Sequence, residues 1–326
     1  MNNKKRVIVW RVIQNCNMRC QFCSYSNDVD RIRSRADPSD VKRLIQVLGE
    51  YKQKTGEDIL ISWIGGEPFL WDEIMSFSRM LSVKYHIDVS ATTNGLLLSD
   101  DKVRSRIIRY FSEIVFSMDG LRECNDRVRK HPGHFDIVKR NIEALDRERK
   151  AQGSKLVIKV NTILMRHNIH QFVELCSMLA DIGVDEVTFN QLGGYDRPEF
   201  FNDNRLKPDQ VKSFHDRLPE IKRKYAEKGL IIHGSEMYMD RIIKSTEDRV
   251  NSIDECNSCS WFWFINENGY ISPCSYTSYE YRYDIRTIKS ADDIPKVENY
   301  FRELRKTCRS HWCNDCYCTQ VYDKFE

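Results

Sequence analysis

Three cysteines near the start of the chain have the residue type and spacing of metal ligands. Cys16, Cys20 and Cys23 follow one another as C-x3-C-x2-C. Zinc would suit three thiolates if a His or Asp from elsewhere in the chain closed the site as a fourth ligand. In a [4Fe–4S] cluster, three cysteines hold three irons and the fourth iron stays open for a substrate or cofactor. The spacing alone leaves both kinds of metal centre open.

A second group of seven cysteines lies in the last quarter of the chain. Its members are Cys256, Cys259, Cys274, Cys308, Cys313, Cys316 and Cys318. The asparagine and glycine of NENGY (266–270) suit a hairpin turn that brings the flanking cysteines together. Seven thiolates could hold two clusters, one of them with an open position or a ligand such as His311 or Asp315, or one cluster with spare cysteines. A zinc ribbon is the alternative, because C-x2-C pairs separated by a hairpin also bind zinc.

The net charge limits the expected partners, and the expected compartment limits what the cysteines can do. The net charge is +3 and the pI about 8.2, with basic residues spread along the chain. We therefore expect no nucleic-acid partner and no membrane partner. The apolar run that starts at Val7 is too short for a signal peptide or a spanning helix, which predicts a cytoplasmic protein. Thiols stay reduced there, so disulfides are not expected. The two isolated cysteines, Cys124 and Cys176, are interpreted as small buried hydrophobic residues.

The residues between 6 and 194 predict the elements that position these groups. Short runs rich in Val, Ile, Phe and Thr alternate with amphipathic segments, which is typical of β/α repeats. The predicted strands are 6–13, 58–66, 88–95, 113–120, 156–164 and 186–194, and helical patterns lie at 38–48 and near 71–84, 99–110, 136–151 and 168–182. We expect an α/β fold with a partial (β/α)6 TIM-like barrel, whose chemistry collects at the carboxyl ends of the strands.

The rest of the chain predicts two further regions. Residues 195–207 have the composition of a loop, and helical patterns follow near 208–228 and 235–250. Beyond residue 254 the sequence is rich in cysteines, aromatic residues and turn residues and poor in aliphatic ones, so a small domain there needs metal for stability. The expected domains are a barrel over 1–207, a helical connection over 208–253 and a cluster-binding domain over 254–326.

Three motifs that follow predicted strands together resemble the radical S-adenosylmethionine (radical SAM) superfamily. They are the C-x3-C-x2-C motif with Phe22 before its last cysteine, GGEP (65–68) after the second strand, and FSMDG (116–120) at the end of the fourth. The resemblance implies that Cys16, Cys20 and Cys23 hold a catalytic [4Fe–4S] cluster. Its open iron would bind S-adenosylmethionine, and reductive cleavage would give a 5′-deoxyadenosyl radical that abstracts a substrate hydrogen.

The same resemblance implies further cofactor contacts. Glycines allow close approach of the backbone, and a carboxylate accepts hydrogen bonds from an ammonium group. Ser117 is a candidate ribose contact, whereas Asp119 could bind the cofactor or only shape its turn. Arg129 could reach a carboxylate or be a solvated charge at a helix start, and Asn94 could bind a ligand or hold its own turn. The implied cofactor-binding residues are Phe22, Gly65, Gly66, Glu67, Asn94, Ser117, Asp119 and Arg129.

The C-terminal cysteines resemble those of SPASM and twitch auxiliary-cluster domains. From Cys259 the pattern C-x9-G-x4-C runs through Gly269 to Cys274, and Cys256 also satisfies it with twelve intervening residues. A later C-x2-C pair would complete the ligand set. Cys318 follows that pair too closely for the usual SPASM ending. The resemblance implies one or two auxiliary [4Fe–4S] clusters with ligands among the seven cysteines.

The implied activity is auxiliary-cluster-assisted oxidation or crosslinking of a peptide, as in maturation of ribosomally made natural products, or of a protein residue. The alternatives are a small-molecule enzyme, such as an aminosugar dehydrogenase or epimerase, and a non-catalytic iron–sulfur or zinc-binding module. The implied partners are a peptide or small-molecule substrate and an electron donor of the flavodoxin or ferredoxin type. The first strand begins near residue 6, so no leader-peptide recognition domain is expected before the barrel. This weakens the peptide alternative, although the recognition domain could be a separate protein.

Overall fold

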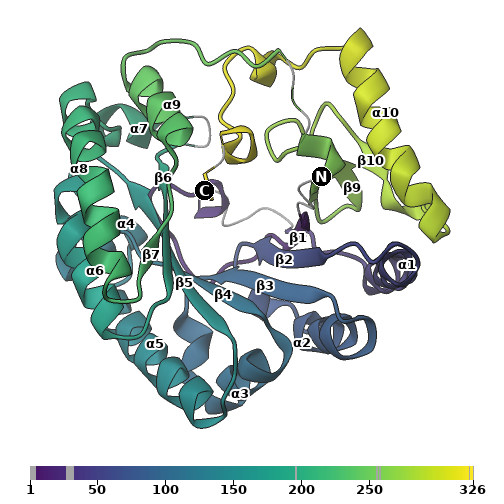
Figure 1. The fold of residues 1–326 in the computed structure, drawn as a ribbon, viewed down its shortest axis with the longest axis horizontal. Helices are drawn as coiled ribbons and strands as arrows, with labels where there is room; N and C mark the ends of the chain where they lie inside the picture. The colour runs from purple at the N-terminus through teal and green to yellow at the C-terminus, as the bar shows by residue number, and fades with distance from the viewer. Residues whose placement is uncertain are drawn as a thin grey trace. The chain divides into compact units, whose positions relative to one another are not determined.

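The computed structural model describes residues 5–26, 33–194, 197–254, 256, 258–322 and 324–325. The chain divides into two compact units, each built from separate stretches of sequence. The first unit contains residues 1–15, 32–91 and 250–321, and the second contains residues 16–31, 92–249 and 322–326. Within each unit, parallel strands alternate with helices along the chain (Figure 1).

The first unit begins with parallel pairing of β1 (Arg6–Ile13), β2 (Ile59–Gly65) and β3 (Asp88–Thr93). Helix α1 (Pro38–Thr55) connects β1 to β2, and α2 (Ile74–Arg79) leads through a π-helical turn (Met80–Lys84) to β3. The Asp37 side chain accepts hydrogen bonds from the N–H groups of Ser39 and Asp40, which fixes the start of α1. The helix ends at Gly56, whose φ of 72° is left-handed.

The C-terminal part of the first unit adds to the other side of β1. Strand β8 (Phe262–Ile265) pairs parallel with β1, and β9 (Tyr270–Ser272) pairs antiparallel with β8 and with β10 (Tyr283–Asp284). The hairpin predicted at NENGY is confirmed, with Gly269 at a φ of 79° in its turn. All four residues of β8 are buried, so these aromatic residues pack in a core. Helix α10 (Ile294–Thr307) follows where no helix was predicted.

The second unit contains the parallel series β4 (Glu113–Ser117), β5 (Val157–Leu164), β6 (Glu186–Gln191) and β7 (Ile231–Ile232). Helices α3 (Asp101–Tyr110), α5 (His134–Ala151), α6 (Phe172–Asp181) and α8 (Pro208–Ala226) lie along one side of these strands (Figure 1). The remaining helices are α4 (Arg122–Arg129), α7 (Pro198–Asn204) and α9 (Glu236–Thr246).

The six predicted strands are all present, but several end earlier than the sequence suggested. Strand β3 stops before Asn94 and Gly95, and β4 stops before Gly120, because both glycines have positive φ values that end extended structure. The prediction of a loop over 195–207 is wrong for most of that stretch. Pro198 occupies the first turn of α7, where its fixed φ favours a helix. Tyr195 and Asp196 lie outside the described residues.

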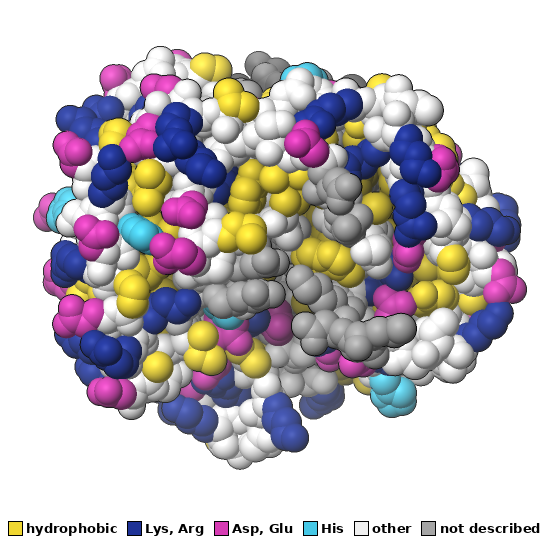
Figure 2. All heavy atoms as spheres, turned by 45° about the horizontal axis from the view of Figure 1, so that its top comes forward, with side chains coloured by type: hydrophobic (Ala, Val, Ile, Leu, Met, Phe, Trp, Pro, Cys, Tyr) yellow, Lys and Arg dark blue, Asp and Glu magenta, His cyan; other side chains and the backbone are white. Residues whose placement is uncertain are grey.

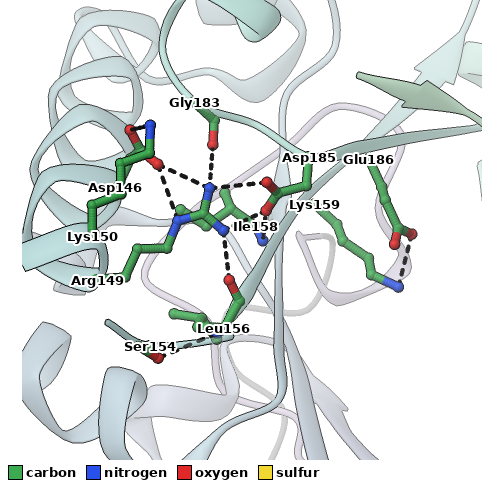
Figure 3. Close-up of polar contacts among 10 residues, drawn as sticks. All are labelled: Asp146, Arg149, Lys150, Ser154, Leu156, Ile158, Lys159, Gly183, Asp185 and Glu186. Carbon is green, nitrogen blue, oxygen red and sulfur yellow. Dashed lines mark hydrogen bonds and ion pairs between the residues drawn. The ribbon is translucent and has the colours of Figure 1, made fainter. Parts of the chain in front are cut away.

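A buried arginine joins the amino ends of two strands in the second unit. The guanidinium of Arg149, at the end of α5, donates hydrogen bonds to the carboxylates of Asp146 and Asp185 and to the carbonyl oxygens of Leu156 and Gly183 (Figure 3). Leu156 directly precedes β5, Gly183 and Asp185 precede β6, and Asp146 lies in α5 itself. The network therefore holds the strand edge opposite to the carboxyl ends, where chemistry is expected.

The face drawn in Figure 2 carries Lys and Arg side chains interspersed with Asp and Glu. Such mixing does not produce an extended field of one sign. In the described part of the chain, no helix combines the length and apolar character needed to cross a membrane.

Candidate functional site

The first three cysteines lie on a loop that begins directly after β1 and is fixed to α4 in the second unit. Gln21 donates its backbone N–H to the Val128 carbonyl (2.8 Å) and its side-chain amide to the Arg127 carbonyl (3.0 Å). Cys20 is buried, whereas Cys16 and Cys23 are half-buried. All twelve cysteines are described, and none forms a disulfide. The loop therefore presents three thiols from a backbone that a helix end holds in place.

Asn94, in the turn after β3, lies beside the first of these thiols. Its Nδ2 donates to Oδ1 of Asn17 (2.7 Å) and is 3.8 Å from Sγ of Cys16. Its Oδ1 accepts the N–H of Leu96 (3.0 Å), so the side chain also holds its own turn. The interpretation that Asn94 holds its own turn is confirmed, and its amide nitrogen faces the cysteine loop; binding of a ligand by Asn94 stays a prediction.

Asp119 and Arg129 form a buried ion pair under the same loop. Arg129 Nη2 is 2.7 Å from Asp119 Oδ2, and the guanidinium carbon lies 5.8 Å from the centroid of the Phe22 ring. The other carboxylate oxygen accepts the backbone N–H of Ile163 (2.7 Å). Arg129 ends α4 and is 5% exposed, so its interpretation as a solvated charge at a helix start is wrong. Burial raises the pKa of the Cys20 thiol to about 12, and the Arg129 charge acts in the opposite direction.

A group of polar side chains lies along β5 and β6, next to the end of β4. Ser117 ends β4 and lies opposite Asn161 in the register of the two strands. Asn161 Oδ1 accepts hydrogen bonds from Thr188 Oγ1 and Asn190 Nδ2, each at 2.9 Å. Asn190 Oδ1 in turn accepts one from Lys324 Nζ (2.9 Å). Nothing in the residue pattern indicated that Lys324 would join this group.

Lys324 is buried, and no carboxylate among the described residues lies within ion-pair distance of its amine. Burial lowers the pKa of Lys324 to about 7, because the charged form loses its hydration. A second residue that the sequence did not reveal is His134, which is fully buried at the start of α5. Both residues make contacts across long sequence separations, and a one-dimensional pattern does not encode such contacts.

In the first unit, the GGEP loop is bound to the backbone that leads into the first cysteine. The N–H of Gly66 donates to the Ile13 carbonyl and that of Glu67 to the Asn15 carbonyl, both at 2.8 Å. A Cβ atom on Gly66 would lie 2.2 Å from the Asn15 oxygen, and one on Gly65 would lie 2.2 Å from the Ile13 oxygen. Only glycine fits at either position. The Glu67 side chain is fully buried, and one of its oxygens accepts the N–H of Phe69 (3.3 Å).

A pocket in the C-terminal part of the first unit is lined by five of the seven late cysteines. Aromatic side chains and Arg305 complete its walls. Cys259 and Cys308 are not among the lining residues. Cys259 is buried, with its carbonyl oxygen accepting a hydrogen bond from Trp263 Nε1 (3.3 Å), and Cys308 is exposed at the end of α10. The thiols that line the pocket belong to Cys256, Cys274, Cys313, Cys316 and Cys318.

The donor set of this pocket fits an iron–sulfur cluster. Its lining contains thiols and aromatic groups but no carboxylate, and thiolates in apolar surroundings are the usual ligands of such clusters. Four sulfurs bound to one zinc ion at 2.3 Å would lie within about 4 Å of one another. In the described part of the chain, no three His, Cys, Asp or Glu side chains are arranged to hold a single ion.

Comparison with known proteins identifies the family. The model of the radical SAM superfamily matches residues 10–179, more than half of the chain. The chain therefore belongs to the radical SAM superfamily. Among curated relatives, the Fe-coproporphyrin III synthase of Methanosarcina barkeri is 24% identical over 231 residues, which cover 70% of this chain and 54% of the relative. The chain thus spans about half the length of that relative.

Two solved structures share the fold. Streptococcus suis SuiB bound to precursor peptide SuiA has a TM-score of 0.67 and 14% identity. The match covers 98% of this chain and 71% of the SuiB chain. The structure of anSMEcpe with bound AdoMet and the Cp18Cys peptide has a TM-score of 0.65 and 17% identity. The match covers 98% of this chain and 90% of the anSMEcpe chain. The predicted fold class, an α/β partial TIM-like barrel with a cysteine-rich C-terminal region, is confirmed.

Proposed function

We propose that this member of the radical SAM superfamily oxidises or crosslinks a peptide or protein residue with the help of an auxiliary cluster. The chemistry that a bound [4Fe–4S] cluster and S-adenosylmethionine supply is reductive cleavage to a 5′-deoxyadenosyl radical, which abstracts a substrate hydrogen. The observation that carries the proposal is the pocket lined by five cysteines in the same chain as the C-x3-C-x2-C loop. A second thiol-lined site is what distinguishes an assisted oxidation from simple hydrogen abstraction.

The residues of the chain have separate tasks in this proposal. Cys16, Cys20 and Cys23 would hold three irons of the cluster, and the fixed loop would keep the spacing of their thiolates. Gly65 and Gly66 let the GGEP loop lie against the backbone before Cys16, where a Cβ at either position would collide with a carbonyl oxygen. In this proposal the loop, held in that position, contacts the cofactor. The remaining proposed cofactor contacts are Glu67, which is fully buried in the first unit, and Ser117 at the carboxyl end of β4.

We infer that residues 254–326 form an auxiliary-cluster domain of the SPASM or twitch type, after a barrel over 1–207 and a connection over 208–253. The pocket favours one auxiliary cluster over two, because Cys259 and Cys308 lie outside its lining. Four of the five lining cysteines suffice for one [4Fe–4S] cluster, and the fifth would be spare. This assignment gives Cys256, not Cys259, as the ligand that precedes the hairpin.

A peptide substrate is supported by the fold shared with SuiB and anSMEcpe, whose structures include peptides. A small-molecule substrate is the second candidate, and the likeness to a Fe-coproporphyrin III synthase favours it. In either case the proposal requires an electron donor of the flavodoxin or ferredoxin type in the cytoplasm. For a peptide, it also includes a separate leader-recognition protein.

Anaerobic reconstitution of the full chain with iron and sulfide tests the proposal. We expect about eight irons per chain, four for each of two clusters, and formation of 5′-deoxyadenosine with dithionite and S-adenosylmethionine. Cys20→Ser should abolish that product, whereas Cys176→Ala, which changes a buried cysteine of α6, should retain it. Zinc in place of iron, or 5′-deoxyadenosine formed by Cys20→Ser, would overturn the assignment.

A second pair of variants tests the auxiliary pocket. Cys313→Ala removes a lining thiol and should lower the iron content by about four per chain if one cluster is lost. Cys308→Ala removes a thiol that does not line the pocket and should leave the iron content unchanged. About twelve irons in the unmodified protein would show that two auxiliary clusters are present, and equal losses in both variants would show that Cys308 is also a cluster ligand.

A further inference from the structure

A buried histidine orients the turn that faces the first cysteine. His134 Nδ1 lies 2.9 Å from Asn125 Nδ2, and His134 Nε2 lies 2.9 Å from the carbonyl oxygen of Asn94. The Asn125 amide is fixed, because its Oδ1 accepts the N–H of Asp119 (3.0 Å). An amide nitrogen only donates, so Nδ1 accepts and Nε2 carries the proton that is donated to Asn94. The contacts thus select one neutral tautomer of the imidazole.

The neighbourhood of the histidine is rigid. The Asp126 carboxylate accepts the N–H groups of Gly133 (2.6 Å) and Phe135 (2.8 Å), which fixes the start of α5 on either side of His134. Burial lowers the pKa of His134 to about 4, so the ring stays neutral at physiological pH. A buried, fully bonded imidazole of this kind holds its partner in one orientation.

The side chain of Asn94 is held at both ends of its amide. Its oxygen accepts the N–H of Leu96, and its nitrogen donates to Asn17, which follows Cys16 in the chain. With the backbone carbonyl bound by His134, the amide nitrogen lies 3.8 Å from Cys16 Sγ. This distance is within reach of a weak N–H···S hydrogen bond. The chain therefore contains a donor next to one ligand of the proposed catalytic cluster.

We propose that Asn94, held by His134, donates an N–H···S hydrogen bond to the Cys16 thiolate and raises the reduction potential of the cluster bound there. The inference rests on the proposed function, since it needs a cluster on Cys16. Hydrogen bonds to ligand sulfurs stabilise the reduced, more negative state and so make reduction easier. Asn94 and His134 are positioning residues in this account and do not contact the substrate.

The test is the midpoint potential of the cluster that responds to S-adenosylmethionine, followed by electron paramagnetic resonance in the reconstituted full chain. Asn94→Leu should make the reduction equilibrium about tenfold less favourable, which is about 59 mV for a one-electron couple. His134→Leu should shift the potential in the same direction. His134→Gln, which keeps a donor, should restore it. The double variant of Asn94→Leu and His134→Leu should equal Asn94→Leu alone, because both act through one bond.

Asn141→Leu is the matched control. Asn141 Nδ2 donates to the carbonyl of Gly95 (2.8 Å) and to Ser99 Oγ (3.2 Å), so it holds the backbone that follows Asn94 in the same turn. This variant should lose stability and keep its potential. If His134→Leu does not hold iron, Asn94→Asp replaces the donor by an acceptor of the same shape and should also lower the potential.

An unchanged potential in the Asn94 variants, or an equal shift in Asn141→Leu, would overturn the inference. Loss of iron in every Asn94 variant would overturn it as well, because Asn94 would then be needed for cluster binding. An unmodified protein that shows no cluster responsive to S-adenosylmethionine would instead refute the proposed function itself. The two failures are therefore distinguishable.

Discussion

Replacing the buried lysine near the end of the chain should make the protein's stability less dependent on pH. Lys324 lies in the second unit, where its amine donates to Asn190 and lies 5.9 Å from the centroid of the Tyr238 ring. It is 5% exposed, and burial lowers its pKa from 10.5 to about 7. Lys324→Met keeps a long unbranched side chain and removes the amine, so it isolates the effect of that one group.

The sign and size follow from proton linkage. Between pH 7 and 10.5 the unfolded chain holds a proton on this lysine that the folded chain has lost, so the free energy of unfolding rises with pH over that window. At 1.36 kcal/mol per pH unit, the gain between pH 7 and pH 9 is about 2 kcal/mol. Below pH 7 both states are protonated and this dependence ends. Lys324→Met has no proton to exchange and should lack the gain.

The assay is the urea midpoint at several pH values, measured by tryptophan fluorescence on the reconstituted protein under anaerobic conditions. The difference between Lys324→Met and the unmodified protein should shrink by about 2 kcal/mol from pH 7 to pH 9. Lys155→Met, which changes an exposed lysine, controls for the loss of one surface charge and should follow the unmodified protein. A constant difference in the free energy of unfolding across this range would show that burial does not lower the pKa of Lys324, and the reasoning would be refuted.

Three further variants test contacts described above. Gly66→Ala should weaken binding of S-adenosylmethionine, measured by equilibrium dialysis, because its Cβ would meet the Asn15 oxygen at 2.2 Å, whereas Gly193→Ala has open space and should bind normally. Arg129→Met should lower the free energy of unfolding by about 3–5 kcal/mol, because it leaves the buried Asp119 carboxylate unpaired; a loss no greater than that of a surface variant would contradict this. Arg149→Lys should lower the free energy of unfolding by about 2–4 kcal/mol in the same urea assay, because one ammonium group cannot replace a planar guanidinium that donates to four residues. A variant as stable as the unmodified protein would contradict the role shown in Figure 3.

The parallel strands could be predicted because their signal is local. Each strand is a short apolar run, and the pattern of β/α alternation needs no knowledge of tertiary contacts. Helix α4 escaped prediction because its sequence, RECNDRVR, is strongly polar, although Cys124, Val128 and Arg129 are buried in the structure. Helix α10 was missed because the surrounding cysteines and turn residues suggested irregular structure. In both helices, burial of one face outweighs the local composition.

The candidate site also contains residues that the sequence predicts and contacts that it does not. The cysteines and the two glycines are recognisable in sequence because their chemistry depends on residue type and spacing. The orientation of Asn94 is different, because it depends on a carbonyl contact with His134, forty residues later in the chain. Likewise, nothing adjacent to Arg129 in the sequence indicates that its partner is Asp119. Such pairings arise only when separate strands and helices meet.

The pairing of β1 with β8 joins residues near the start of the chain to residues beyond 260. During synthesis, therefore, one edge of β1 stays without its neighbour until most of the protein has left the ribosome. An unpaired parallel strand with buried residues invites association with other chains. A nascent chain that stops before β8 would therefore be prone to aggregate. The last quarter of the protein thus completes the fold of its first strand, in addition to presenting its own cysteines.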